Sequence, residues 1–200
     1  MAGNTRFHAI TAKTPEHLIF DAGVVYKNFV DLSNFGEEMG ATRGGSEWNA
    51  GIEKRNIEVD GIPGPTKGFT RIVRVEPTMT INLLSLNSQN LKDSIPGAKL
   101  EDGEEGFENY KKLTIKQITD DDYIDNIALI ARTGSGRMAI FVIENVLADG
   151  GFGISFVDQD ESNPAVTFQA HFDPAKLEAV DDPMDAIPAY IIYPDEIAAP

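Results

Sequence analysis

Residues 134–139 are the first place in this sequence where residue types and spacing could serve chemistry. They read Gly-Ser-Gly-Arg-Met-Ala, which matches the G-x-G-x-x-G/A pattern of dinucleotide-binding turns. That pattern requires a helix after the second glycine, whereas residues 138–147 contain Ile, Phe, Val and Ile in succession and predict a strand. We therefore interpret the two glycines as a β-hairpin turn and not as a cofactor site.

An acidic stretch at residues 158–163 resembles the beginning of a calcium-binding loop, with the sequence Asp-Gln-Asp-Glu-Ser-Asn. Such a loop needs Gly at its sixth position and Glu at its twelfth, where this chain has Asn163 and Gln169. We predict a solvated turn, and weak cation binding at residues 158–161 is left open. The three Asp residues at 120–122 are interpreted in the same way, as a charge run between strands.

The histidines and carboxylates show no spacing that indicates an active site. His8, His17 and His171 have no metal-ligand spacing between them, and we expect the last two to be partly buried, hydrogen-bonded rings in strands. With no cysteine and three histidines, zinc sites and nucleophilic triads are poorly supported. A hydrolase with a pair of catalytic carboxylates is a remote alternative, because such catalysis needs a cleft geometry that sequence cannot show. We predict no catalytic residue, no metal and no cofactor.

The charge of the chain is unevenly distributed. Residues 1–100 contain 11 basic and 11 acidic residues, whereas residues 101–200 contain 6 and 21, so the whole net charge of −15 lies in the second half. Such a surface repels nucleic-acid phosphates. It indicates either simple solubility or a surface past which DNA moves without sticking. No apolar run is long enough to span a bilayer as a helix, so we expect no membrane insertion, and the N-terminus does not resemble a signal peptide.

Much of the first half predicts strands separated by turns that contain Gly and Pro. Residues 17–29 predict strand material that bends at Gly23, and residues 46–59 predict a strand with a bulge near Lys54 and Arg55. Three glycines in residues 40–45 precede this second strand and indicate a loop. Residues 61–68 contain two prolines and three glycines and predict a projecting loop.

The clearest strand pattern lies within residues 71–86. Between Val73 and Leu83 one parity is apolar and the other is polar, which is typical of an antiparallel sheet solvated on one face. The polar positions are Arg74, Glu76, Thr78, Thr80 and Asn82. Pro77 cannot donate to a strand ladder, so we expect the strand to be kinked, broken or at a sheet edge there.

The remaining segments predict one short helix and more strands. Asn87 is a candidate N-cap for a helix that runs to Ile95, and residues 101–108 predict an acidic loop. Strands are predicted at residues 113–118, 123–132, 138–147, 152–157 and 165–172, and a helical turn within residues 174–184. The strands at 123–132 and 138–147 are apolar on both parities, so we expect both of their faces to be covered.

The expected fold class is mainly β, a sandwich or barrel of antiparallel strands with one short flanking α-helix, extended loops and terminal arms. We expect a single domain over residues 1–200. Its parts are an N-terminal arm at residues 1–16, a β-sandwich core at residues 17–186 with loops at 36–45 and 61–68, and a C-terminal arm at residues 187–200. This profile favours an interaction or structural protein over an enzyme.

Three stretches resemble the major tail tube proteins of long-tailed, non-contractile phages. They are LIFDAGVVYKNF at residues 18–29, GATRGGSEW at residues 40–48, and IEVDG at residues 57–61 with Gly68 after it. In that family an Asp-Ala-Gly strand, an Ala-Thr-Arg-Gly-Gly element and a Val-Asp-Gly turn occur in this order. The resemblance covers residues 18–95 and extends more loosely beyond, where AVTFQAHFDP at residues 165–174 resembles the family's closing strand.

The resemblance implies a structural virion protein with the tail-tube fold. Hexameric rings would stack into a tube that conducts DNA during ejection, and four strands from each subunit would close a β-barrel around the lumen. The candidate lumen-lining residues are Arg74, Glu76, Thr78, Thr80 and Asn82. Ring stacking would use projecting parts, and the candidate stacking residues are Arg43, Gly44, Gly45, Ile62, Pro63, Pro65 and Lys67.

The resemblance also implies the partners and the location. The partners would be further copies of the chain, a tape-measure protein, and the tail terminator and baseplate or distal tail proteins. DNA would pass through the lumen without specific binding. Assembly would take place in the host cytoplasm, and the assembled protein would belong to the phage tail.

Two other functions are compatible with the residues. One is the tube protein of a related contractile-injection or secretion system. The other is a non-enzymatic β-sandwich module that binds a ligand such as carbohydrate, although the chain contains a single Trp and few Tyr outside predicted strands.

Overall fold

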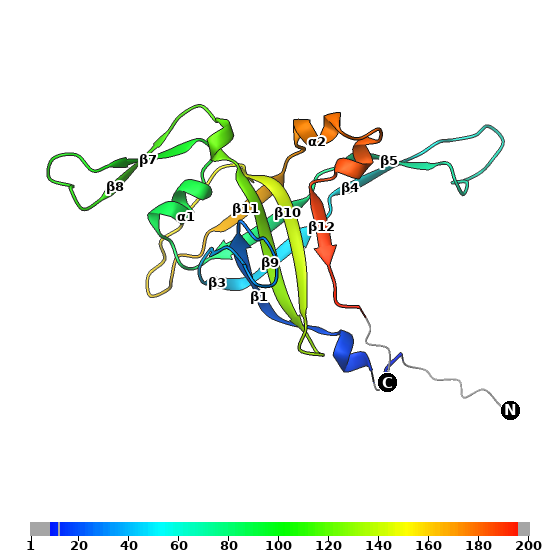
Figure 1. The fold of residues 1–200 in the computed structure, drawn as a ribbon, viewed down its shortest axis with the longest axis horizontal. Helices are drawn as coiled ribbons and strands as arrows, with labels where there is room; N and C mark the ends of the chain where they lie inside the picture. The colour runs from blue at the N-terminus through cyan, green and yellow to red at the C-terminus, as the bar shows by residue number, and fades with distance from the viewer. Residues whose placement is uncertain (1–8, 12, 196–200) are drawn as a thin grey trace.

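The computed structural model describes residues 9–11 and 13–195, and it consists of a curled antiparallel sheet from which two long hairpins project to opposite sides (Figure 1). Strands make up 43% of the described residues and helices 12%. The predicted mainly β class with antiparallel sheets is therefore confirmed. No helix among the described residues is long and apolar enough to cross a membrane.

The main sheet contains eight strands. Seven follow the order β2-β1-β9-β10-β11-β6-β3, and β12 pairs with β10. Every pairing in it is antiparallel. The strand bounds are β1 Ile19–Lys27, β2 Glu37–Glu38, β3 Thr42–Asn49, β6 Thr78–Leu83, β9 Ile124–Thr133, β10 Met138–Asp149, β11 Ala165–Ala170 and β12 Ala189–Ile192.

β10 is shared between two pairing partners on one of its edges. That edge pairs with β12 at residues 140–143 and with β11 at residues 146–149, while the opposite edge pairs with β9. Asn145 lies between the two segments with a φ of 49°, and its Nδ2 donates to the carbonyl of His171 at 3.2 Å. A residue in this left-handed conformation interrupts the strand ladder and separates β11 from β12.

The main core lies inside the curl of the sheet. Val25 of β1 and Ile127 of β9 are buried in one cluster with Ile81 of β6 and Phe168 of β11. These strands are separated in the strand order, so their contact means that the sheet closes around a common apolar interior. Burial of this apolar surface is the main favourable term that holds the curl together.

A second apolar layer covers the outer face of β1, β9 and β10. Its buried members are Phe29, Ala128, Ile130, Ile140 and Val142. Tyr26 and Phe35 pack over this layer, with their ring centroids 5.5 Å apart. Because β9 and β10 are buried on both faces, their sequences are apolar on both parities, and this prediction is confirmed.

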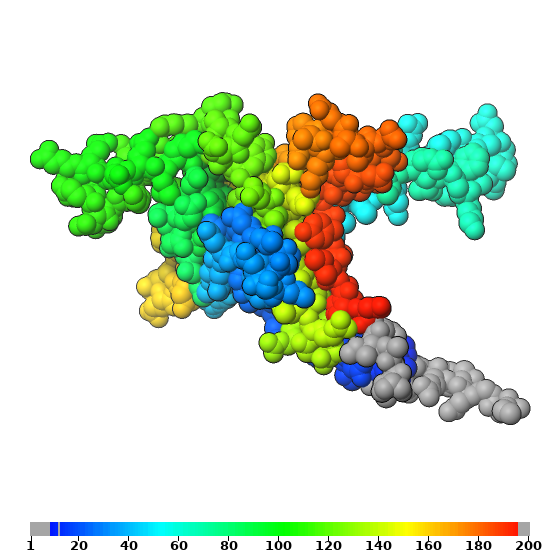
Figure 2. Space-filling view, in the orientation of Figure 1, coloured from blue at the N-terminus to red at the C-terminus, as the bar shows by residue number. Residues whose placement is uncertain are grey.

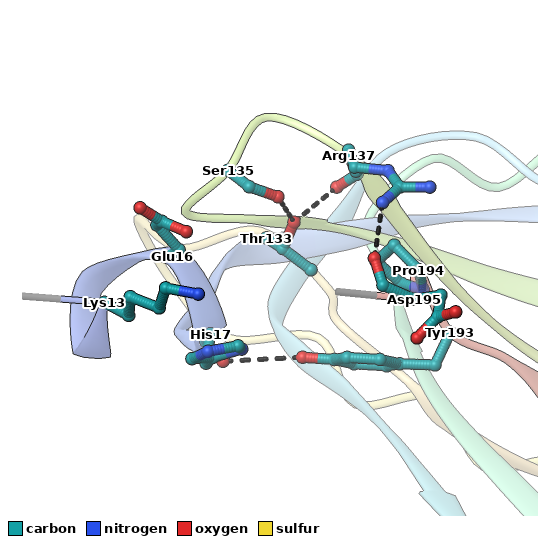
Figure 3. A pocket seen from close by; sticks show the side chains of 9 residues that line it. All are labelled: Lys13, Glu16, His17, Thr133, Ser135, Arg137, Tyr193, Pro194 and Asp195. Carbon is teal, nitrogen blue, oxygen red and sulfur yellow. Dashed lines mark hydrogen bonds between the residues drawn. The ribbon is translucent and has the colours of Figure 1, made fainter. Parts of the chain in front are cut away.

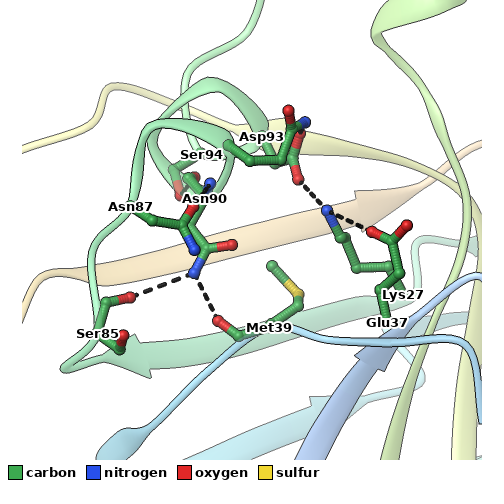
Figure 4. Close-up of polar contacts among 9 residues, drawn as sticks. Lys27, Glu37, Met39, Ser85, Asn87, Asn90, Asp93 and Ser94 are labelled. Atoms are coloured by element: carbon green, nitrogen blue, oxygen red, sulfur yellow. Dashed lines mark hydrogen bonds and ion pairs between the residues drawn. The ribbon is translucent and has the colours of Figure 1, made fainter. Parts of the chain in front are cut away.

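Helix α1 (Ser88–Asp93) is held against the end of the curl. The side chain of Asn87 accepts a hydrogen bond from the backbone N–H of Asn90 at 2.7 Å, which confirms the predicted N-cap. Asn90 is itself buried, and its Nδ2 donates to the carbonyls of Met39 and Ser85 at 2.6 and 3.2 Å (Figure 4). These bonds tie the helix to the chain that leads into β3.

Two hairpins form separate two-stranded sheets. The β4–β5 arm is residues 52–75 and contains β4 Ile52–Asn56 and β5 Thr70–Val75. The β7–β8 arm is residues 98–115 and contains β7 Ala98–Asp102 and β8 Lys111–Ile115. Both arms leave the same end of the body in opposite directions, cyan and green in the space-filling view (Figure 2).

Short helical segments complete the described chain. They are η1 Thr14–His17, η2 Asp120–Asp122, α2 Pro174–Glu178 and η3 Pro183–Ala186. The last two confirm the helical turn predicted within residues 174–184. The flanking helix is therefore accompanied by more helical structure than the sequence predicted.

The predicted irregularities of the strands are confirmed. The pairing of β1 with β9 shifts register between Phe20 and Val24, around the predicted bend at Gly23. The pairing of β4 with β5 shifts between Glu53 and Lys54, at the predicted bulge. The chain also breaks between β5 and β6 at Pro77.

Several local predictions are wrong. Residues 152–157 form no strand, because β11 finds its partners in β10 and β6 instead. The strand predicted at 46–59 is divided at residues 50–51, and β3 begins at Thr42, inside the predicted loop at 36–45. β7 includes Glu101 and Asp102 of the predicted acidic loop, because lysines on β8 pair with these carboxylates.

The predicted terminal arms are only partly described. β12 lies within the predicted arm at 187–200 and is a strand because the edge of β10 is open to it. His17 belongs to η1 and is exposed, so its predicted place in a strand is wrong. His8, most of the predicted arm at residues 1–16 and residues 196–200 lie outside the described residues.

Candidate assembly surfaces

The glycines of residues 134–139 form a hairpin turn between β9 and β10. The backbone N–H of Gly136 donates to the carbonyl of Thr133 at 2.8 Å, and that of Thr133 donates to the carbonyl of Arg137 at 2.8 Å. A strand follows the glycines and not a helix, so the phosphate-binding helix N-terminus of a dinucleotide site is missing here. The interpretation as a hairpin turn is confirmed.

The acidic turn at residues 158–163 contacts β3 of the same chain. Nη1 of Arg43 lies 3.1 Å from Oδ1 of Asp160 and 2.6 Å from Oε2 of Glu161. The hydrogen bond from Arg43 lowers the pKa of Asp160, and the same bond raises the pKa of Arg43. Nδ2 of Asn163 donates to the carbonyl of Arg43 at 3.0 Å. Within the described residues no group of three His, Cys, Asp or Glu side chains could hold a metal ion.

These contacts place Arg43, Gly44 and Gly45, three of the candidate stacking residues, in β3 and not in a free loop. Pairing of β3 with β6 shifts register between Thr42 and Ser46, so the glycines occupy an irregular part of the strand. The carbonyl of Gly45 accepts a hydrogen bond from Nδ2 of Asn82 at 3.0 Å. Gly44 and Gly45 have φ angles of 88° and 87°, so the left-handed backbone of this irregular part of β3 explains the two glycines.

Three adjacent strands, β3, β6 and β11, present a polar face away from the core. We call it the polar sheet face, and its members are Glu47, Asn49, Thr78, Thr80, Asn82, Thr167 and Gln169. Thr80 lies opposite Glu47 on one side and Thr167 on the other, and the two threonine hydroxyls are 2.9 Å apart. The alternate residues of β6 are fully buried, so the two-faced pattern predicted for this strand is confirmed over residues 78–83.

The break at Pro77 divides the candidate lumen-lining residues. Thr78, Thr80 and Asn82 lie together on the polar sheet face. Arg74 belongs to β5 on the β4–β5 arm and forms an ion pair with Glu76 at 2.6 Å. The sequence reasoning missed the other members of the face, although Glu47 and Asn49 flank Trp48, and Thr167 and Gln169 flank Phe168, in the same alternation.

The β4–β5 arm exposes a large amount of apolar surface. Its exposed apolar side chains are Ile52, Ile57, Val59, Ile62, Phe69, Ile72 and Val73. The candidate stacking residues Ile62, Pro63, Pro65 and Lys67 lie in the loop at its end, where 53% of Ile62 is exposed. An isolated two-stranded hairpin is only marginally stable in water, so such a surface indicates a partner.

The β7–β8 arm has three ion pairs along its strands and two aromatic rings at its tip. Lys111 pairs with Asp102, Lys112 with Glu104 and Lys116 with Glu101. Phe107 and Tyr110 are exposed and meet edge to face with centroids 5.8 Å apart. The strand predicted at residues 113–118 overlaps β8, whereas β7 was not predicted, because charged residues occupy much of it.

An ion pair holds the base of the β7–β8 arm to η2. Nζ of Lys99 lies 2.6 Å from Oδ1 of Asp122, whose side chain is 4% exposed. Burial raises the pKa of Asp122, but hydrogen bonds from Lys99 and Thr119 outweigh it and the net pKa is lowered. The acidic triplet at 120–122 is therefore more than the solvated charge run that was predicted.

The first and last described segments meet beside the β9–β10 turn (Figure 3). Arg137 donates from Nη1 to the carbonyl of Asp195 at 2.6 Å, and Tyr193 lies with its hydroxyl 3.5 Å from the carbonyl of His17. The cavity between them has a volume of about 70 Å³. Such a space holds a few water molecules and is too small for an organic substrate.

His171 is partly buried and hydrogen-bonded, as predicted. It is half-buried, and its Nδ1 lies 3.3 and 3.2 Å from the carbonyls of Asn145 and Gln169. Its ring meets Tyr123 edge to face. These contacts describe a structural histidine at the point where β10 changes partners.

Comparison with protein families and with curated proteins finds no match to this chain. The assignment of a function therefore depends on the surfaces described above.

Proposed function

We propose that this chain is a structural subunit that polymerises, in stacked hexameric rings, into the tail tube of a long-tailed, non-contractile phage, without enzymatic activity. The observation that carries the proposal is the pair of arms that project in opposite directions from a body with a polar sheet face, one of them rich in exposed apolar side chains and the other with two exposed aromatic rings at its tip. Projecting surfaces that meet different surfaces on the next copy give contacts that do not close on themselves, and such contacts build rings and tubes.

The exposed apolar area favours self-assembly over a monomeric state. The β4–β5 arm alone exposes seven large apolar side chains, from Ile52 to Val73. Large exposed apolar surfaces are rare in monomeric proteins, and they mark interaction sites or aggregation hazards. Polymerisation would remove the aggregation hazard, because other copies of the chain would cover the exposed apolar side chains.

Open strand edges support pairing between copies. In the described residues β3 pairs with β6 on one edge only, and β12 pairs with β10 on one edge only. Unpaired edges invite pairing with another chain. Edge pairing around a ring would place the polar sheet face on the inside of a barrel, with Thr78, Thr80 and Asn82 toward the lumen.

The chemistry of the polar sheet face suits passage of DNA. Its members are Thr, Asn, Gln and one Glu, none of which carries a positive charge. Together with the net charge of −15, this face would let DNA move without specific binding. We also propose that the partners are tape-measure, terminator and baseplate proteins and that assembly takes place in the host cytoplasm. These two points rest on the resemblance alone.

Electron microscopy tests the proposal directly. We expect negatively stained samples of the purified protein, at high concentration or together with its tail partners, to contain hollow tubes or stacked rings. A protein that stays monomeric under all these conditions contradicts the proposal.

Replacing residues 62–67 by a Gly-Ser linker of equal length is expected to impair polymerisation and to leave the fold intact. The replaced residues lie in an exposed loop away from both core clusters, so far-ultraviolet circular dichroism and the melting temperature should hardly change. The amount of tube recovered by sedimentation should fall at least about tenfold, since apolar anchors near the centre of an interface carry much of its energy. Undiminished tube growth would remove this loop from the interface.

A further inference from the structure

Lys27 is a buried lysine whose side-chain nitrogen contacts two carboxylates. Its Nζ lies 2.8 Å from Oδ2 of Asp93 and 3.4 Å from Oε2 of Glu37 (Figure 4). The side chains of Lys27 and Asp93 are each 7% exposed. In every other ion pair that joins a lysine or arginine to a carboxylate among the described residues, at least one side chain is more exposed than either of these. A nitrogen nucleophile and a carboxyl group are therefore held together out of water.

The second oxygen of Asp93 has a hydrogen-bond donor of its own. Nε2 of Gln89, one turn earlier in α1, donates to Oδ1 of Asp93 at 2.8 Å. Oδ2 therefore faces the lysine, while Oδ1 is polarised by an amide N–H. A donor in this position also stabilises the negative charge that develops on Oδ1 when a nucleophile adds to the carboxyl carbon.

A polar cavity of about 530 Å³ opens beside the pair, and Lys27, Glu37, Gln89 and Asp93 all contribute to its lining. Glu37 belongs to β2 and lies opposite Lys27 in the strand register. Its side chain is 70% exposed, so its carboxylate can exchange protons with solvent as well as with Nζ of Lys27. The site thus combines a nucleophile, an electrophile, a proton carrier and an exit for water.

We propose that Lys27 and Asp93 form an intramolecular amide (isopeptide) bond after the chain has folded, with Glu37 as the proton carrier. The ion pair is the starting state. A proton passes from the ammonium group of Lys27 to Oδ2 of Asp93 and leaves an amine and a carboxylic acid, which are the uncharged forms that a desolvated site favours. The fixed contact between the two side chains removes the entropic cost of bringing them together, which is large for a reaction between separate molecules.

The formation of this bond needs no oxidant, reductant or second substrate. Nζ of Lys27 adds to Cγ of Asp93, and the π electrons of the carbonyl move to Oδ1, beside the amide of Gln89. Glu37 takes a proton from the added nitrogen and delivers it to Oδ2, which leaves as water when the Cγ–Oδ2 bond breaks. The products are one secondary amide and one water molecule, and the reaction occurs once in each chain.

The bond would tie α1 to β1 across 66 positions of the sequence. The chain between them includes β3, the β4–β5 arm and β6, so all of these elements would lie in one covalently closed loop. Such a cross-link restricts the unfolded chain and stabilises the folded one. The chain contains no cysteine, so a disulfide cannot serve this purpose. The inference concerns a bond within one copy and does not depend on the proposed function.

Mass spectrometry of the full chain tests the proposal. After prolonged incubation of the folded protein we expect a species that is lighter by one water molecule, and a protease digest should contain a branched peptide that joins Lys27 to Asp93. Lys27→Arg keeps the positive charge but supplies no amine, so this variant should lack the branched peptide. Asp93→Asn should give the same branched peptide as the unaltered protein, because the side-chain amide loses ammonia in place of water.

Glu37→Gln should slow the reaction at least about tenfold, because it removes the proton carrier. Glu38→Gln is the matched control, since Glu38 is the other residue of β2 and lies opposite Tyr26 instead of Lys27. If the aged protein contains no branched peptide, the proposal is overturned. A loss of water that maps to an Asp-Gly sequence, such as Asp60-Gly61, is a succinimide and overturns it as well. Equal rates in the Glu37 and Glu38 variants would overturn the role given to Glu37.

Discussion

Replacing Asp93 by alanine is expected to lower the free energy of unfolding by about 3 kcal/mol, because the substitution leaves a buried ammonium group without its main partner. Lys27 and Asp93 both have side chains that are 7% exposed, and Nζ of Lys27 lies 2.8 Å from Oδ2 of Asp93 (Figure 4). Glu37 is 3.4 Å from the same Nζ, but its side chain is 70% exposed, so it compensates only weakly.

Urea unfolding, at a concentration where the protein is monomeric, measures this loss. For a chain of this size, about 3 kcal/mol corresponds to a fall of roughly 6–12 °C in melting temperature. Lys27→Met combined with Asp93→Ala removes both charges and should recover most of the stability. Glu37→Ala should change it by less than about 1 kcal/mol. If the single Asp93 variant is as stable as the double variant, the buried ion pair is not a major contributor.

The Lys27–Asp93 pair also shows where the sequence is uninformative. The two residues are 66 positions apart, and neither lies in a pattern that distinguishes it from a surface charge. The same holds for Arg43, whose carboxylate partners lie 117 and 118 positions away. Contacts of this kind depend on how the strands are ordered, and strand order is not encoded in local periodicity.

Elements with a strong local signal were predictable. Residues 78–83 alternate because one side of β6 faces the core and the other side faces solvent. The long apolar strands β9 and β10 are joined by a turn that the glycines between them predicted. Asn87 caps α1, as its residue type predicted. In each case a single physical requirement acts on neighbouring residues.

Elements without a core-facing side were missed. β7 contains Glu101 and Asp102 because the β7–β8 arm stands in solvent, where Lys116 and Lys111 pair with these carboxylates, so no apolar period marks the strand. β12 is short and lies between prolines, and it becomes a strand because the edge of β10 is available. Residues 152–157 contain apolar residues but find no free edge, since β11 is paired on both sides.

The bend between β3 and β4 determines where the β4–β5 arm points, and Gly51 is the residue that permits it. Gly51 has a φ of 57°, and a Cβ atom there would lie 1.9 Å from the carbonyl oxygen of Glu76. The carbonyl of Gly51 also accepts a hydrogen bond from the backbone N–H of Glu76 at 3.0 Å. Pro77 breaks the facing strand at the same level, so both strands of the hairpin turn together.

Gly51→Ala is therefore expected to destabilise the protein by about 2–4 kcal/mol, from the left-handed backbone conformation and the clash with Glu76. It should also redirect the arm and abolish tube formation, because the docking surfaces would no longer align. Gly61→Ala is the matched control, since Gly61 has a φ of 82° but a Cβ there meets no atom within 4 Å. That control should lose about 1 kcal/mol and still assemble. Equal losses in the two variants, with assembly retained in both, would show that the close approach at Gly51 does not orient the arm.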